Sequence, residues 1–135
     1  MEKDVTLEYQ SNCKINLGLQ VLNKRNDNFH NLESIFVEIH LFDDIIFKKS
    51  NTFQFSSDNK SITQLKNNTI SQAYNHLQLL SNNHQEYSIH LAKNIPIGSG
   101  LGGGSSNAAT VLKVLNNLWS LQLSNDKLMQ IGASI

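Results

Sequence analysis

The residues best suited to chemistry gather in one short stretch, between Asn94 and Ser106. Five of the seven glycines in the 135-residue chain lie between Gly98 and Gly104. Because glycine permits positive φ and carries no β-carbon, backbone N–H groups in such a loop can converge on an anion. Ser105 and Ser106 add two hydroxyl groups at the end of the loop. The stretch therefore predicts a cradle for phosphate groups.

The elements on either side of the glycine loop should position it. Before the loop, Tyr87, Ile89 and Leu91 alternate with more polar residues, which predicts a strand. Behind the loop, apolar residues recur at helical spacing, namely Ala108, Val111, Leu112, Leu115, Leu118 and Trp119. A helix that begins here points its N-terminus at the loop, where each favourable charge contributes about 0.3 to 1 kcal/mol.

Two common phosphate loops fit this stretch incompletely. Gly98–Gly103 matches the dinucleotide pattern G-x-G-x-x-G between a strand and a helix. That site also needs an acidic residue about 20 positions further on, and Leu118–Gln122 contains none. The Walker A pattern fails because no Gly-Lys-Ser/Thr ends the loop. An NAD-binding oxidoreductase fragment remains an alternative that rests on the glycine pattern alone.

A second candidate group lies near the N-terminus. From Lys14 to Val21, apolar residues alternate with polar ones, which predicts a half-buried strand with Lys14, Asn16 and Gln20 on one face. Further strand segments are predicted at 32–40 and 41–48, with a bend at Asp43-Asp44.

Two more helices are predicted from period and capping residues. A helical period over Asn67–Leu80 follows Asn68 or Thr69 as a candidate N-cap. A final short helix should begin near Ser124. One domain with a mainly β first half is therefore expected.

Composition excludes several classes of function. Eleven basic and eleven acidic residues give zero net charge, so no nucleic-acid-binding surface is predicted. No apolar run approaches the roughly 18 residues of a membrane span, and the acids in Met1–Thr6 are unlike a signal peptide. Cys13 cannot form an internal disulfide, and the five histidines are too scattered for a zinc site. We expect a cytoplasmic protein with no nucleic acid, membrane or structural metal as partner.

The stretch Pro96–Ala109 resembles, over fourteen ungapped positions, the second motif of the GHMP kinases, P-x-G-x-G-L-G-G-G-S-S-N-A-A. This resemblance implies the α+β fold of the family's N-terminal nucleotide-binding domain (ribosomal protein S5 domain 2-like). It also implies that the loop binds ATP, with Ser105 and Ser106 near the transferred phosphate and its Mg²⁺. The residues expected at ATP are Pro96, Ile97, Gly98, Ser99, Gly100, Leu101, Gly102, Gly103, Gly104, Ser105 and Ser106.

Two upstream segments narrow the resemblance. Cys13–Leu17 and Asn28–Ser34 are similar to the A-K-I-N-L and G-Y-H-E segments of family members that phosphorylate the 2-hydroxyl of 4-diphosphocytidyl-2-C-methyl-D-erythritol in isoprenoid synthesis. GHMP kinases acting on homoserine or mevalonate share the loop but lack these segments in this form. The resemblance implies that Lys14 is the active-site lysine, with Asn16 beside it on the substrate side.

The resemblance implies further roles, each of which competes with an ordinary explanation. His30 would contact the cytosine end of the substrate, and Phe29 would stack where the family has tyrosine. Asn68 and Lys93 resemble positions near the adenosine and phosphates of ATP. On residue type alone, a strand lysine or a lone histidine is usually solvated, and an asparagine before a helix is usually a cap.

The last residues, Leu123–Ile135, resemble the stretch that leads into the family's aspartate motif, and the chain ends before it. Asp126 cannot replace that aspartate, because it falls in the capping turn of the preceding helix. We therefore expect residues 1–135 to be an N-terminal nucleotide-binding domain without its C-terminal domain. Whether such a part acts as a kinase or only as an ATP-binding module stays open.

Overall fold

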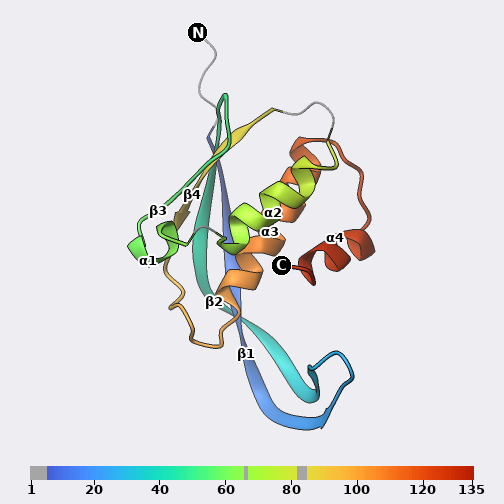
Figure 1. The fold of residues 1–135 in the computed structure, drawn as a ribbon. Coiled ribbons are helices and arrows are strands. Elements are labelled where there is room, and N and C mark those ends of the chain that lie inside the picture. Colours follow the sequence, from blue (N-terminus) through green and yellow to red (C-terminus); the bar gives the residue numbers. More distant parts are fainter. Residues whose placement is uncertain (1–5, 66, 82–84) are drawn as a thin grey trace.

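The computed structural model describes residues 6–65, 67–81 and 85–135. It contains one four-stranded sheet with two helices packed against a single face, a third helix outside them and a short fourth helix beside the edge strand (Figure 1). The strands are β1 (Thr6–Lys24), β2 (His30–Lys49), β3 (Gln54–Ser57) and β4 (Tyr87–Ala92). The helices are α1 (Lys60–Thr63), α2 (Thr69–Gln78), α3 (Gly103–Leu118) and α4 (Asn125–Gly132). This arrangement confirms the predicted α+β class.

The sheet has the order β1-β2-β4-β3. β2 pairs antiparallel with both β1 and β4, and only the pair of β3 with β4 is parallel. The strand predicted around Tyr87–Leu91 is confirmed as β4, which leads through the glycine loop into α3. None of the helices in the described ranges is long and apolar enough to span a membrane.

Capping residues set the starts of two helices as the sequence predicted. The Asn68 side chain accepts a hydrogen bond from the Ser71 backbone N–H at 2.8 Å, which starts α2. The Ser124 hydroxyl accepts one from the Lys127 N–H at 3.2 Å, which starts α4. Such caps satisfy N–H groups that have no partner inside the helix.

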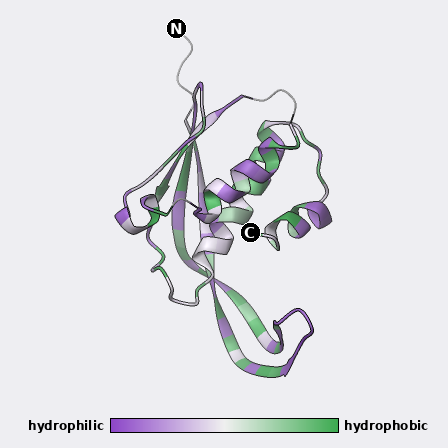
Figure 2. Cartoon of the chain, viewed as in Figure 1, coloured by the Kyte–Doolittle hydropathy of each residue, from purple (hydrophilic) through white to green (hydrophobic). Residues whose placement is uncertain are grey.

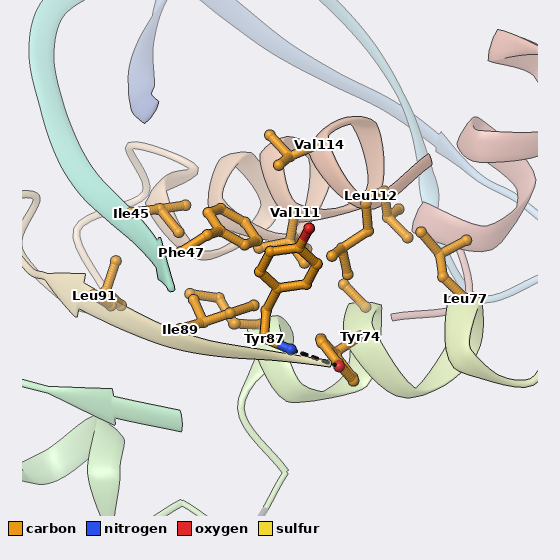
Figure 3. Packing of buried hydrophobic residues seen from close by; sticks show 14 of the residues in the cluster. Ile45, Phe47, Tyr74, Leu77, Tyr87, Ile89, Leu91, Val111, Leu112 and Val114 are labelled. Carbon is orange, nitrogen blue, oxygen red and sulfur yellow. Dashed lines mark hydrogen bonds between the residues drawn. The ribbon is translucent and has the colours of Figure 1, made fainter. Parts of the chain in front are cut away.

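The core lies between the sheet and the helices α2 and α3. Ile45 and Phe47 from β2 meet side chains of β4, α2 and α3, and all of the labelled residues in this cluster are buried (Figure 3). Burying one such large apolar side chain contributes about 1.5 to 3 kcal/mol. The Tyr87 backbone N–H donates to the Tyr74 hydroxyl within this cluster, so the polar tip of Tyr74 is paired (Figure 3).

The predicted bend at Asp43-Asp44 is wrong. β2 continues through both residues as one strand, and Asp43 is completely buried. Aspartate favours turns because its side chain can hydrogen-bond nearby backbone groups of its own segment. Here the Asp43 carboxylate pairs with the Lys93 ammonium at 2.6 Å, which compensates its burial.

The predicted placement of Gln20 beside Lys14 is also wrong. Leu17 pairs with Ile35 and Leu19 pairs with Ser34, so Gly18 is an extra residue in β1. Its φ of 62° fits a glycine bulge, and a bulge reverses the alternation of faces that follows it. Lys14 and Asn16 share one face, while Gln20 belongs to the opposite one.

Residues 17–36 form what we call the arm, a two-stranded extension of β1 and β2 that leaves the rest of the molecule (Figure 1). Apolar residues recur along it (Figure 2). Its exposed large apolar side chains are Leu17, Leu19, Val21, Leu22, Phe29, Leu32, Ile35 and Phe36. The remainder of the described chain, which holds the core and the glycine loop, is called the body below.

Candidate functional site

The glycine loop joins β4 to α3 and is shaped by left-handed glycines. Gly98, Gly100 and Gly102 have φ values of 69°, 74° and 74°. In this region a β-carbon is disfavoured, so the alternate glycines fix the course of the loop. Gly102 is also the N-cap of α3 and has no side chain to bond the first N–H groups of the helix. These N–H groups can therefore bind an anion.

Gly103 is required for close approach rather than for its φ. A β-carbon there would lie 2.9 Å from Ile95 Cγ2 and 3.2 Å from Lys93 Nζ. At Gly104 the nearest atom, Thr69 Oγ1, would lie at 3.8 Å, an ordinary contact. Only glycine lets the start of α3 pack directly on the segment that enters the loop.

A hollow of about 410 Å³ lies beside the loop. One group of lining residues is apolar, namely Phe55, Ile62, Leu65, Ile70 and Leu91. The other group comes from the loop and its neighbours: Asn67, Asn68, Thr69, Lys93, Pro96, Ile97, Gly98, Ser99, Gly100, Gly102, Gly103, Gly104, Ser105 and Asn107. The arrangement can hold a ligand with an apolar end and an anionic end.

Most residues predicted at ATP thus line one hollow. Leu101 and Ser106 are the exceptions; Leu101 accepts a backbone hydrogen bond from Lys14, and Ser106 contacts Ser11. Sequence reasoning missed the apolar side, because it predicted neither β3 nor α1, which supply Phe55 and Ile62. Both elements are only four residues long and carry little periodic signal.

Asn68 and Thr69, at the start of α2, both line the hollow. The side-chain oxygen of Asn68, Oδ1, already accepts the capping hydrogen bond of α2. The Thr69 hydroxyl donates to the Gly104 carbonyl at 3.0 Å, which joins the starts of α2 and α3. Asn68 is therefore a cap that also lines the hollow, and a nucleotide role for it stays a prediction.

Lys93 lines the hollow, but its charge is paired inside the protein. The ammonium donates to Asp43 Oδ2 at 2.6 Å and also to the Ile95 carbonyl. Only 5% of its side chain is exposed. Its predicted contact with ATP remains untested, and any such contact would be made by an ammonium already neutralised by a carboxylate.

Lys14 lies directly against the glycine loop. Its ammonium donates to Gly100 O at 2.9 Å and to Asn16 Oδ1 at 2.6 Å, and its backbone N–H donates to Leu101 O at 3.0 Å. Asn16 in turn donates to the Ser34 hydroxyl at 2.9 Å. The predicted neighbours Lys14 and Asn16 are thus brought to the loop, although their chemical roles stay predictions.

The two serines after the glycines lie in the first turn of α3. Ser105 lines the hollow, whereas the Ser106 hydroxyl accepts a hydrogen bond from the Ser11 hydroxyl at 2.9 Å. In the part of the chain that the structure describes, no three His, Cys, Asp or Glu side chains converge on a possible metal position.

Phe29 and His30 lie at the tip of the arm and do not line the hollow. Phe29 is 73% exposed, and its backbone N–H donates to Asp27 at 3.1 Å. Desolvation raises the pKa of Asp27, but hydrogen bonds from Phe29 and Arg25 together hold that pKa below its usual value. Of the predicted substrate residues, the structure therefore brings Asn16 to the glycine loop, through Lys14, but not Phe29 or His30.

The part of the chain that holds the glycine loop also matches a known protein family. Residues 68–135 match the family described as GHMP kinases N terminal domain. The matched half of the chain contains α2, β4, the glycine loop, α3 and α4. The chain belongs to the GHMP kinase family. The mostly antiparallel sheet is also unlike the parallel sheet of dinucleotide-binding domains, which removes the oxidoreductase alternative.

Within the GHMP kinases, the chain is similar to proteins named 4-diphosphocytidyl-2-C-methyl-D-erythritol kinase. The one from Chlorobium chlorochromatii is 42% identical over 123 residues, covering 91% of this chain and 43% of the relative. The one from Thermodesulfovibrio yellowstonii is 43% identical over 123 residues, covering 91% and 42%.

A solved structure shows the same likeness. The crystal structure of a 4-(cytidine 5'-diphospho)-2C-methyl-D-erythritol kinase superimposes with a TM-score of 0.77 at 28% identity, covering 95% of this chain and 45% of that chain. The chain therefore spans less than half the length of the relatives that it matches.

Proposed function

We propose that this chain provides the ATP-binding part of a kinase that phosphorylates the 2-hydroxyl of 4-diphosphocytidyl-2-C-methyl-D-erythritol. The observation that carries the proposal is the contact of the Lys14 ammonium with the glycine loop at Gly100, 2.9 Å. It joins a phosphate cradle to a cation on the strand that leads into the arm. The similarity to kinases named for this substrate supports the choice of acceptor.

The hollow suits a nucleotide triphosphate. Its apolar side, with Phe55, Ile62 and Leu65, suits a flat purine base. Its polar side offers the backbone of the glycine loop and the N-terminus of α3, which suit phosphates. The close contact that a β-carbon at Gly103 would make with Ile95 supports a requirement for glycine at the base of the proposed cradle.

Phosphoryl transfer asks mainly for alignment and for stabilisation of charge on the transferred group. An ammonium has three N–H bonds, and two of those on Lys14 are used by Asn16 and Gly100. Among the described residues this leaves one N–H for a ligand. We infer that Lys14 uses it to stabilise negative charge between the bound nucleotide and the acceptor hydroxyl.

Magnesium fits the site only together with the nucleotide. The residues that line the hollow include no Asp or Glu, and hydroxyl groups are among the oxygen ligands that they offer. Ser105 offers one at the start of α3, Ser106 lies one residue further on, and Ser99 and Thr69 also line the hollow. When bound, Mg²⁺ neutralises part of the charge of the phosphates. The chain itself contributes N–H groups, hydroxyl groups and the Lys14 ammonium.

The arm is proposed to hold the cytidine end of the acceptor. Phe29 offers an exposed aromatic face for stacking, and His30 offers a ring nitrogen for a hydrogen bond. Phe36 lies close enough to Lys14, with 5.3 Å between Nζ and the ring centroid, to connect the arm to the reacting centre.

The test is consumption of Mg-ATP by the purified chain, with and without the acceptor, alongside direct titration of ATP binding. We expect the wild-type chain to bind ATP; any acceptor-dependent turnover should be abolished by Lys14→Ala, and binding without turnover would identify the chain as the ATP-binding part alone. Lys49→Ala removes an exposed lysine at the end of β2 and should behave as wild type. A folded chain that does not bind ATP, or equal turnover in Lys14→Ala, would contradict the proposal.

A further inference from the structure

A buried polar cluster lies next to the glycine loop, and the proposed function does not use it. At its centre is the Asp43 side chain in β2, which is 0% exposed and forms an ion pair with Lys93, 5% exposed. A buried charge is costly unless it is paired and hydrogen-bonded. Such a charge in a strand core calls for an explanation beyond packing.

All four donors to this carboxylate come from the two ends of the loop. Oδ1 accepts the backbone N–H groups of Asn94 and Ile95, each at 2.7 Å. Oδ2 accepts from Lys93 Nζ at 2.6 Å and from Asn107 Nδ2 at 3.0 Å. The first three donors precede the glycines, and Asn107 belongs to α3 behind them.

Asn107 depends on Asp43 for its orientation. The residue is 2% exposed, and its Oδ1 atom has no hydrogen-bond partner in the described chain. If the amide were turned around, its oxygen would face the carboxylate, which is repulsive. The bond from Nδ2 to Asp43 therefore fixes the side chain, and with it the contact between α3 and β2.

Lys93 extends the cluster to the first residue of α3. Besides pairing with Asp43, its ammonium donates to the Ile95 carbonyl. The position of a β-carbon on Gly103 lies 3.2 Å from Lys93 Nζ. One carboxylate and one ammonium thus hold the entry of the loop close to the start of the helix, while Lys14 contacts the middle of the loop at Gly100 and Leu101.

We propose that Asp43 is a positioning residue for the phosphate site, because it clamps both ends of the glycine loop and so preorganises the N–H groups before a nucleotide binds. A loop already held in its bound shape loses less conformational freedom on binding. The proposal rests on the proposed function in one respect, namely that the loop holds the phosphates of ATP. A purely structural cluster would stabilise the fold without favouring phosphates.

The decisive variant is Asp43→Asn, which keeps the shape of the side chain and removes its charge. In the folded variant, we expect the dissociation constant for Mg-ATP to rise about tenfold or more, equivalent to about 1.4 kcal/mol. Adenosine has no phosphates, so its dissociation constant should change less than about twofold. Amide hydrogen exchange at Asn94 and Ile95 should become faster.

Two further variants control the experiment. Asp44→Asn makes the same chemical change one residue along, where the carboxylate receives only a 3.5 Å contact from Asn94, and should leave all three readouts unchanged. Asn107→Ala keeps the Asp43–Lys93 pair and removes the link to α3. If Asp43→Asn does not fold, Asn107→Ala must show the same selective loss of ATP affinity over adenosine affinity.

Two results would overturn the proposal: a folded clamp variant with wild-type ATP affinity, or equal loss of ATP and adenosine affinity. A wild-type chain that binds no ATP would instead contradict the proposed function. In that case the clamp is judged by hydrogen exchange, and unchanged exchange across residues 94–104 in both clamp variants would refute it.

Discussion

The body and the arm share the strands β1 and β2, yet apolar side chains on these strands are buried in the body and exposed in the arm. Ile45 and Ile35 both lie on β2, but Ile45 is 0% exposed and Ile35 is 65% exposed. Both segments are comparably rich in apolar residues, and the helices α2 and α3 cover only one of them (Figures 1 and 2). Burial is therefore decided by what packs against a strand and not by the strand's own pattern.

The same contrast separates the two halves of the candidate site. In the body, Lys14, the glycine loop and Asp43 are joined by hydrogen bonds between distant parts of the chain. At the tip of the arm, Phe29 is bonded only to its own turn, through Asp27 and Arg25. The proposed nucleotide side is preformed, whereas the proposed acceptor side offers exposed groups.

The largest expected difference between the two regions is in stability. Ile45→Ala should lower the free energy of unfolding by about 2 to 5 kcal/mol, because it leaves a cavity in the core. Ile35→Ala should change it by less than about 0.5 kcal/mol. Urea denaturation of both variants measures this, and equal losses would mean that the arm is packed as tightly as the body.

A second pair of variants tests close packing within the body. Gly103→Ala should destabilise the chain by about 1 to 3 kcal/mol, because the new methyl group would meet Ile95 at 2.9 Å. Gly104→Ala, with 3.8 Å of room, should be neutral or raise stability by up to about 1 kcal/mol through helix propensity. Thermal unfolding compares the two, and the reverse order would contradict the close approach at the start of α3.

Alkaline pH should lower the free energy of unfolding of the body through ionisation of Tyr74. Burial, followed by the hydrogen bond to Glu86, raises the pKa of Tyr74 above its ordinary value of 10.0. Since the folded state then holds the proton more tightly than the unfolded state, the contribution of Tyr74 to stability should be constant below pH 10 and fall as pH rises above it. Stability of Tyr74→Phe measured against pH should fall less steeply, and an identical slope would exclude Tyr74 as the cause.

The sequence predicted the parts of this structure that local patterns determine. The glycine loop, β4 and the caps Asn68 and Ser124 depend on residue types close to one another in the chain. Asp43 was predicted at a bend because its partners, Lys93 and Asn107, lie 50 and 64 positions away. The bulge at Gly18 becomes visible only in the pairing of β1 with β2. The alternation of apolar and polar residues along β1 therefore could not show that Gln20 lies on the opposite face from Lys14.

The candidate site was predictable to the same extent. The motif grouped residues most of which line one hollow, and the strand period placed Lys14 next to Asn16. Neither could show that Lys93 is neutralised by Asp43, or that Phe29 lies away from the hollow. Both facts follow from tertiary contacts that no local pattern encodes.

The smallest effects on the body are expected from changes at the tip of the arm. Phe29→Ala and His30→Ala should alter stability by less than about 0.5 kcal/mol, because these side chains lie outside the core. They should leave ATP affinity unchanged and weaken binding of the cytidine-containing acceptor. Calorimetric titration with each ligand separates the two effects, and a loss of ATP affinity would show that the arm reaches the nucleotide.

The central claim is that the body binds the nucleotide and the arm does not. Its most direct test is an NMR titration of the wild-type chain with Mg-ATP, followed residue by residue through the backbone amides. The account predicts that signals of residues 98–106 and of Lys14 shift, while those of residues 19–33 in the arm stay in place. Shifts confined to the arm, or none in the glycine loop of a folded chain, would contradict it.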